Sequence, residues 1–328
     1  MKHLSVILYL LLVISFAPAT SIAAHILVIE SYHAQYPWDN GYKKALTETL
    51  GQDHTFSFFQ MDTKRLPKSK YAKMAELAWQ EYLTLKPDIV VLGDDNALSY
   101  VGPKLKHTKT PTVYLGINNN PRNYSIADAK NITGVLERPL LKRSLLLIDE
   151  IIPQISKVLV LFDSGATSNV ALQSYFDGQN IIKIGNIEVD IYLIEQYSLW
   201  QQQVITAYEQ DYDAIIIGLY QTIKDKEQNH VKATDVISWT AENSPVPLFG
   251  FWDFSIGKNK ALGGLVLESF HQGVMAAQII KEILDGKPVV KIRPRVAEKG
   301  RFIFSKSQVE KYQLSVPSAI ARLATWVN

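Results

Sequence analysis

Short runs of apolar and β-branched residues alternate with amphipathic stretches along most of this 328-residue chain. The first part contains predicted strands at 25–30, 55–60, 88–92 and 111–115, and predicted helices at 38–50 and 68–85. The run at 88–92 (DIVVL) is apolar on both faces, which is typical of a parallel sheet covered by helices on both sides. The helices between successive strands therefore predict a doubly wound α/β layer.

The same pattern then starts again. Strands are predicted at 157–162, 187–193, 213–218 and 244–250, with helices at 168–182 and 199–210. The segments DAIIIG (213–218) and SPVPLFG (244–250) repeat DIVVLG (88–93) and TPTVYLG (110–116) of the first part. Any α/β chain shows some self-similarity, but paired segments in equivalent order favour two lobes of one architecture.

The remaining segments complicate a simple division into halves. A strand at 131–137 would carry the chain from the first lobe to the second. The later elements are a strand at 262–268, a helix at 270–284, a strand at 302–304 and a helix from Ser307. We therefore expect one lobe from 24–134 plus part of about 251–328, and the other from 135–250. Several crossings between two lobes form a hinge, with the ligand cleft between the lobes.

The N-terminus has the pattern of a secretory signal peptide. A basic start that includes Lys2 precedes the uncharged apolar run 4–17, and small residues follow Pro18. The alternative is a membrane anchor, but this run is shorter than the roughly 20 residues that a membrane-spanning helix needs.

Small side chains at Ser21 and Ala23 place the cleavage after Ala23, with Ser21 and Ala24 as alternative sites. We expect residues 1–23 to be removed and residues 24–328 to be a soluble periplasmic protein.

Composition excludes several kinds of function. The chain contains no cysteine, which excludes disulfides, cysteine nucleophiles, cysteine-ligated metals and a lipid-modified N-terminal cysteine. Its 34 basic and 32 acidic residues give a formal net charge of +2, without the basic surplus of most nucleic-acid-binding proteins. The sequence therefore predicts no nucleic-acid partner.

Signatures of catalysis are missing from the sequence. It has no GxSxG elbow, HExxH motif or P-loop, and no GxGxxG follows the first predicted strand. Its seven histidines show no metal-ligand spacing, so they are expected on the surface or in the core. We predict no catalytic residue, no metal site and no cofactor.

Candidate ligand-binding residues follow the predicted strands, because ligands of open α/β sheets bind beyond the carboxyl ends of the strands. Six such loops combine small residues with polar or aromatic ones, at 31–39, 93–96, 116–120, 163–169, 218–222 and 250–253. From them and from the end of strand 262–268 we select Tyr32, Trp38, Asp94, Asp95, Asn118, Ser164, Ser168, Asn169, Tyr220, Gln221, Trp252, Asp253 and Glu268.

Several candidates also have a purely structural interpretation. Helix capping is the alternative for Asp94, Asp95, Ser164 and Ser168. Trp38 could instead anchor the first helix in the core, and Glu268 could face water.

The candidates together favour a small amphipathic ligand. Backbone N–H groups at 164–169 would bind a carboxylate. An amine would bind to an acid among Asp94, Asp95, Asp253 and Glu268. Aromatic rings would pack on the ligand body at Tyr32, Trp38, Tyr220 and Trp252. This mixture favours an amino-acid-like ligand.

Several segments resemble the periplasmic substrate-binding proteins of ABC transporters, in the family that includes tryptophan- and tyrosine-type binding components. These segments are NITGV (131–135), 151–156 with KVLVLF, YDAIIIG (212–218), PVPLFG (245–250), 264–286 ending in ILDGKP, and the tail QVEKYQLSVP. The resemblance implies the type I periplasmic-binding fold, with two α/β lobes, three crossovers and a cleft that closes around a small ligand. It also implies a membrane permease as partner, and a monomer is the default for this architecture.

The opening segment SYHAQYPWDNGY is rich in aromatic residues and is similar to extracytoplasmic sensor domains of this fold. The sequence therefore predicts the extracytoplasmic substrate-binding component of an ABC-type uptake system, which is not an enzyme. The alternative is a ligand-sensing protein that regulates a membrane kinase or diguanylate cyclase. An exported enzyme is disfavoured because no nucleophile–base pair is evident.

Overall fold

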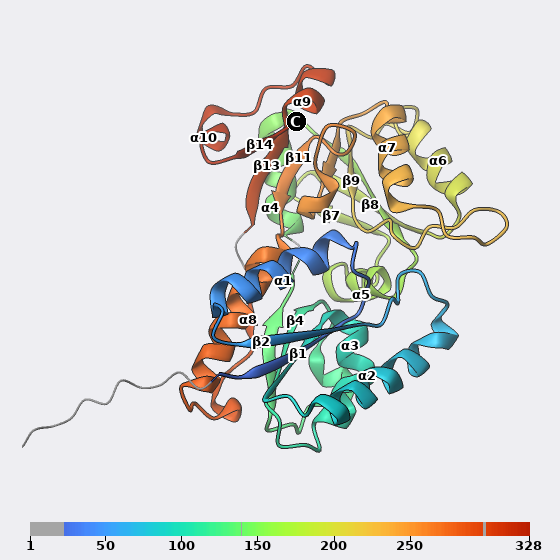
Figure 1. The fold of residues 1–328 in the computed structure, drawn as a ribbon. Coiled ribbons are helices and arrows are strands. Elements are labelled where there is room, and N and C mark those ends of the chain that lie inside the picture. Colours follow the sequence, from blue (N-terminus) through green and yellow to red (C-terminus); the bar gives the residue numbers. More distant parts are fainter. Residues whose placement is uncertain (1–22, 139, 298–299) are drawn as a thin grey trace, which may run out of the picture.

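The computed structural model describes residues 23–138, 140–297 and 300–328, whose elements form two lobes (Figure 1). The first lobe contains β1 (His25–Glu30), α1 (Pro37–Leu50), β2 (Thr55–Gln60), η1 (Lys68–Lys70), α2 (Tyr71–Leu85), β3 (Ile89–Gly93), α3 (Asp94–Leu105), β4 (Thr112–Ile117), η2 (Pro121–Tyr124), β5 (Ile132–Leu136), α8 (Ser269–Leu284), η4 (Val289–Lys291) and β12 (Arg295–Val296). Of the predicted signal peptide, residues 1–22 lie outside the described residues.

The second lobe contains the remaining elements. They are α4 (Leu141–Ile151), β6 (Lys157–Asp163), α5 (Ala166–Tyr175), β7 (Ile181–Ile184), β8 (Ile187–Ile194), α6 (Tyr197–Ile205), β9 (Ala214–Ile217), α7 (Ala233–Asn243), β10 (Leu248–Gly250), η3 (Asp253–Ser255), β11 (Gly263–Val266), β13 (Arg301–Ser305), α9 (Lys306–Lys311), α10 (Ser318–Ala321) and β14 (Thr325–Val327). Across the described residues, no helix has the length and apolar character that a membrane span requires.

Each lobe is built on one sheet with mostly parallel strands. The strand order is β12-β5-β4-β3-β1-β2 in the first lobe and β14-β13-β11-β10-β9-β6-β8-β7 in the second. β1 lies between β2 and β3, and its Ile26 pairs with Phe56 on one side and Ile89 on the other. The two doubly wound α/β layers predicted from the sequence are confirmed.

The apolar runs form central strands because their side chains have a helical layer on each face. Ile26 and Val28 of β1 belong to a core cluster that also contains Leu46 of α1 and continues into the second lobe. Leu27 and Ile29 point the other way, into a cluster with residues of α2 and α3. Burial on both faces explains why β1 lacks the apolar–polar alternation of a half-exposed strand.

The chain passes between the lobes three times. It leaves the first lobe between β5 and α4, returns between β11 and α8, and leaves again between β12 and β13. In Figure 1, α8 lies beside α1 in the first lobe, and the two helices are in contact. The two lobes are therefore connected by three separate segments, none of which is close to another in sequence.

We expected the return to the first lobe at about residue 251, and the structure places β11 in the second sheet. Two glycines permit this position. A Cβ atom on Gly263 would lie 2.7 Å from the Ile303 carbonyl oxygen, and one on Gly264 would lie 2.5 Å from the Gly250 carbonyl oxygen. Only glycine fits so close to both neighbouring backbones, so β11 lies between β10 and β13 and the return comes at α8.

The predicted helix at 168–182 is too long, because α5 ends at Tyr175 and β7 occupies Ile181–Ile184. β7 pairs antiparallel with β8 through a tight turn at Gly185, which has a φ of 62°. Glycine is favoured at such positive φ values, and this turn makes the segment a hairpin instead of a continued helix.

The two lobes begin their sheets with equivalent hydrogen bonds. In the first lobe, the backbone N–H of His25 donates to Asp88 Oδ2 at 2.8 Å. In the second, the backbone N–H groups of Ser156 and Lys157 donate to Asp213 Oδ2 at 2.8 and 2.9 Å. Both aspartates precede the strand paired with the lobe's first strand, which supports the duplication inferred from DIVVLG and DAIIIG.

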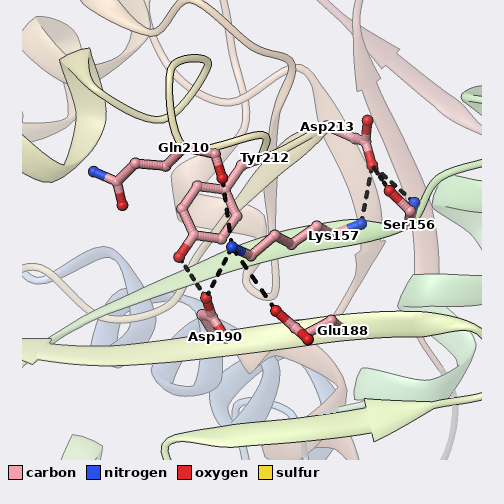
Figure 2. A network of polar contacts seen from close by, with 7 residues as sticks. All are labelled: Ser156, Lys157, Glu188, Asp190, Gln210, Tyr212 and Asp213. Atoms are coloured by element: carbon pink, nitrogen blue, oxygen red, sulfur yellow. Dashed lines mark hydrogen bonds and ion pairs between the residues drawn. The ribbon is translucent and has the colours of Figure 1, made fainter.

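Figure 2 shows that Asp213 belongs to a wider polar network at the start of β6. The Lys157 ammonium lies 3.6 Å from Asp190 Oδ2 and 4.6 Å from the centre of the Tyr212 ring. The Tyr212 hydroxyl donates to Asp190 at 2.6 Å. These contacts connect β6, β8 and the segment before β9 at the sheet edge where the strands begin.

We expect Asp213→Ala to lower the free energy of unfolding by about 1 to 2 kcal/mol, because the charged acceptor of these backbone N–H groups is lost. Urea unfolding of the variant and the wild-type protein measures the change. Glu209→Ala is the matched control, because it removes the same charge from an exposed position nearby. Equal stability of the Asp213 variant and the control would contradict a role for this network in stability.

Candidate ligand-binding site

A small cavity lies between the lobes at the carboxyl ends of the strands, and we call it the inner cavity. It is lined by Tyr32, Tyr36, Trp38, Lys64, Asp94, Asn118, Glu137, Thr167, Leu219, Trp252 and Phe254. Its volume of about 10 Å³ leaves room for about one water molecule. A larger ligand can therefore enter only after side chains move or the lobes separate.

Two wider grooves continue from the inner cavity towards the surface. The first, of about 750 Å³, includes Gly165, Ala166 and Thr167 at the start of α5, and we call it the α5 groove. The second, of about 570 Å³, includes Ala233 and Ile237 of α7, and we call it the α7 groove.

Aromatic rings from both lobes form one wall of the inner cavity. Tyr32 and Tyr36 of the first lobe pack edge to face at a ring distance of 4.8 Å. Tyr36 contacts Phe254 of the second lobe at 5.9 Å, and Phe254 stacks on Trp252 at 6.3 Å. The segment SYHAQYPWDNGY thus supplies Tyr32, Tyr36 and Trp38 to the cavity. Such faces suit an apolar ligand body or a cation.

Two hydrogen bonds join the lobes across the inner cavity. The Trp252 indole N–H donates to Glu137 Oε1 at 2.5 Å. The hydroxyls of Tyr32 and Thr167 lie 3.3 Å apart, and either can be the donor. Because each bond has one partner in each lobe, separation of the lobes would break both.

Asp94 is the acidic group that the fold leaves available in the inner cavity. It is 3% exposed, and its Oδ2 atom has no hydrogen-bond partner among the described residues. Burial raises the pKa of this carboxyl well above its ordinary value, and the negative charges of Asp39 and Glu137 add to the rise. A buried carboxylate without a partner is costly, so this position favours a cationic ligand group.

The backbone at Asp94 and at Gly116 is unusual, and both features bear on where the Asp94 carboxyl lies. Asp94 begins α3 with a φ of 68°, a left-handed conformation that is uncommon for a residue with a side chain. A Cβ atom on Gly116 would lie 3.0 Å from Asp94 Oδ1 and 3.3 Å from Trp38 Nε1. The absence of a side chain at Gly116 therefore lets both groups approach the end of β4, and Trp38 Nε1 also lacks a partner among the described residues.

Asp95, which follows directly, has a structural function. It accepts hydrogen bonds from the backbone N–H groups of Asn118 and Asn119, both at 3.1 Å, and from the Tyr124 hydroxyl at 2.9 Å. Asp95 thus holds the loop after β4, and this loop places Asn118 in the inner cavity.

Glu137 is a cavity residue that the sequence did not single out. Burial raises its pKa to about 8, although the hydrogen bond from Trp252 opposes the rise. It stands directly after β5, at the end of the strand predicted at 131–137. In the sequence, Glu137 could have been selected because it is a polar residue at the end of an apolar run.

The serine and asparagine candidates of the second lobe lie at the α5 groove. Ser164 and Asn169 line this groove. Ser168 is buried, and its hydroxyl donates to Asp163 Oδ1 at 2.6 Å. Ser168 therefore stabilises the loop before α5, while the neighbouring Thr167 reaches the inner cavity.

The remaining candidates occupy different places. Tyr220 and Gln221 line the α7 groove, beside Phe254. Asp253 and Glu268 line neither groove and not the inner cavity. Asp253 accepts a hydrogen bond from the Phe254 backbone N–H at 2.8 Å, and Glu268 forms an ion pair with Arg301. The fold thus brings Tyr32, Trp38, Asp94, Asn118 and Trp252 together and places Asp253 and Glu268 elsewhere.

Lys64 was also not selected from the sequence. It lies in the loop after β2, and this loop was not among the six that we considered. Because β2 pairs with β1 in a parallel register, its carboxyl end lies at the same sheet edge as that of β1.

Within the described residues, no group of three or more histidine and acidic side chains is arranged to hold a metal ion.

Comparison with known proteins gives the family. Residues 81–328 match the model of a family described as ABC transporter substrate binding protein. The chain therefore belongs to the ABC transporter substrate-binding protein family. A search of curated proteins found no match.

Solved structures with low sequence identity share the fold. An ABC domain in complex with L-Trp from Streptococcus pneumonia has a TM-score of 0.69 at 16% identity, over 93% of this chain and 100% of that one. A ligand-free, open substrate-binding protein with adhesive properties from Clostridium difficile has a TM-score of 0.68 at 12% identity, over 93% and 99%. The transcription regulator CcpA of Lactococcus lactis has 0.55 at 12%, over 85% and 97%. The predicted type I periplasmic-binding fold is confirmed.

The raised pKa of Glu137 predicts how stability depends on pH. Because its pKa is about 8 in the folded protein and 4.5 ordinarily, the folded protein keeps a proton that the unfolded chain releases between these values. The free energy of unfolding should therefore fall as the pH rises from about 4.5 to about 8, by up to a few kcal/mol. Glu137→Gln should flatten this dependence in urea unfolding at successive pH values, and an unchanged slope would refute the assignment.

Proposed function

We propose that this protein is the extracytoplasmic substrate-binding component of an ABC-type uptake system, and that it closes around a small, amino-acid-like ligand. The observation that carries the proposal is the Asp94 carboxyl, whose Oδ2 atom has no hydrogen-bond partner among the described residues and which lines the inner cavity with aromatic rings from both lobes. An amine of the ligand would bind to this carboxyl, and its body would pack on the rings. Binding without chemistry fits a family of substrate-binding proteins.

The α5 groove offers a place for the anionic end of such a ligand. The first backbone N–H groups of a helix have no partner within the helix and favour negative charge. Here the first turn of α5, at Ala166 and Thr167, lines the groove, and Thr167 also lines the inner cavity. The proposed amine and carboxylate sites would thus be adjacent, as an amino-acid-like molecule requires.

Closure of the lobes would trap the ligand. The interlobe hydrogen bond from Trp252 to Glu137 and the contact between Tyr36 and Phe254 would form on closure. We propose that residues 24–328 act in the periplasm as a monomer, after removal of the signal peptide, and that the closed form presents the ligand to a membrane permease.

Substitution of Asp94 tests the amine site. We expect Asp94→Asn to weaken binding of the ligand at least about tenfold, or about 1.4 kcal/mol, because the amide carries no charge. The ligand is first identified by a thermal-shift screen of amino acids, amines and small organic acids, in which 100 times the Kd adds roughly 2.7 kcal/mol of stability. Asp253→Asn is the matched control, because Asp253 is partly buried but does not line the cavity or grooves.

Wild-type affinity in the Asp94 variant, or an equal loss in the Asp253 control, would contradict the amine site at Asp94. The variants must first show native circular dichroism and cooperative unfolding.

The alternative function is ligand sensing for a membrane kinase or diguanylate cyclase. It is favoured by the sensor-like segment SYHAQYPWDNGY, because three of its aromatic residues line the inner cavity. For uptake, we expect deletion of the gene to abolish transport of the radiolabelled ligand into cells. Unchanged transport, together with a ligand response that is lost in the deletion strain, would instead support sensing.

A further inference from the structure

Lys64 is the cationic side chain at the centre of the cleft. It is 8% exposed and lines the inner cavity, the α5 groove and the α7 groove. The backbone next to it is fixed, because Asp62 N–H donates to the Tyr32 carbonyl and Thr63 N–H donates to the Ser31 carbonyl, each at 2.9 Å. The loop therefore directs Lys64 into the space between the lobes.

The Lys64 ammonium rests on aromatic faces. Its Nζ atom lies 4.7 Å from the centre of the Tyr32 ring and 5.7 Å from the centre of the Tyr36 ring. Among the described residues, the Lys64 ammonium has no ion-pair or hydrogen-bond partner. Ring faces attract cations through their negative electrostatic potential, and the attraction is strongest where water is excluded. Lys64 thus occupies a site of the kind that binds ligand ammonium groups.

A carboxyl group completes this site. Asp94 lines the same cavity with its Oδ2 atom unpaired. Burial is the largest influence on the pKa of Asp94, and the positive charge of Lys64 opposes the rise that burial causes. Burial raises the pKa of Tyr32 and of Tyr36, and the negative charge of Asp94 adds to the rise in each case. The ring faces and the carboxyl therefore form one cation-binding environment, and a lysine of the chain itself now fills it.

We propose that Lys64 is a tethered competitor of the ligand, and that a cationic group of the ligand binds on Tyr32 and Tyr36 beside Asp94 after it displaces the Lys64 ammonium. The inference rests on the proposed function of the cleft. Two ammonium groups repel each other at this range, so both cannot occupy the small cavity. Lys64 has a path outwards, because its side chain already borders both grooves.

Displacement of this kind selects among ligands. A neutral molecule that pushed Lys64 aside would remove a cation from the rings and the carboxyl without replacing it. A cationic group replaces the lost interaction, and an anion is repelled by Asp94. Lys64 would therefore exclude neutral and anionic compounds from the inner cavity. The stronger the contacts of its ammonium with the rings and the carboxyl, the weaker the binding of such compounds would be.

Chemical complementation tests the proposal. In Lys64→Ala the side chain is removed, and n-butylammonium is its free counterpart in length and charge. We expect the variant to bind n-butylammonium at least about tenfold more tightly than the wild-type protein does, as measured by thermal shift and tryptophan fluorescence. Butan-1-ol and butyrate, which have similar length without the positive charge, should show no such gain.

Lys68→Ala is the matched control, because Lys68 is an exposed lysine of the same α5 groove that does not line the inner cavity. The gain should be absent in this control and should disappear when Asp94→Asn is added to Lys64→Ala. If Lys64→Ala does not fold, Lys64→Ser serves in the same experiment.

Equal n-butylammonium affinity in the variant and wild type would overturn the proposal, as would weaker binding or an equal gain with butan-1-ol. Butyrate that binds the wild-type protein better than the variant would show that Lys64 holds an anionic ligand group. In each of these cases, a ligand found in the wild-type screen would leave the proposed function standing. A screen without any ligand would count against the proposed function independently.

Discussion

The burial of acidic groups at the carboxyl end of the first sheet is the constraint on which the site depends. A parallel sheet brings the ends of its strands to one edge, and the second lobe covers that edge here. Each acid at the edge therefore needs a partner. Lys43 pairs with Glu30 at 2.8 Å, the backbone of the β4 loop satisfies Asp95, and Trp252 donates to Glu137. Asp94 Oδ2 has no hydrogen-bond partner among the described residues, and the cation in the same cavity is the Lys64 ammonium.

Much of the fold could be predicted because strands that are buried on both faces have continuous apolar runs in the sequence. The strands at 25–30 and 55–60 have the predicted bounds, and β3, β8 and β9 lie within a residue or two of theirs. The hairpin β7–β8 was missed, because a single glycine at Gly185 decides between helix and turn. The position of β11 depends on contacts of Gly263 and Gly264 with distant backbones, and periodicity does not report such contacts.

The site was only partly predictable for a related reason. A position at a strand end indicates the edge of the sheet, but it does not indicate the direction of the side chain. Asp94 directly follows a strand that ends in glycine and Asp253 comes three residues after another, yet Asp253 accepts a hydrogen bond from the neighbouring Phe254 N–H and Asp94 lines the cavity. Lys64 gave no local signal, because its position in the cleft follows from the pairing of β2 with β1.

The two lobes have equivalent hydrogen bonds at the start of their sheets and differ at the opposite ends of the strands. Asp88 and Asp213 fix the starts of the two sheets in the same way. At the opposite end of β6, Asp163 accepts hydrogen bonds from Gly165, Ser168 and Thr222, all within its own lobe.

The second lobe therefore satisfies its own strand-end acid, and it contributes Thr167, Trp252 and Phe254 to the inner cavity as ring and hydroxyl contacts. The first lobe contributes the charges, Asp94 and Lys64. In the proposed closure, the rings of the second lobe would exclude water from those charges, and the electrostatic contacts in the cavity would become stronger. We therefore expect recognition of a charged group and the proposed closure of the lobes to be coupled.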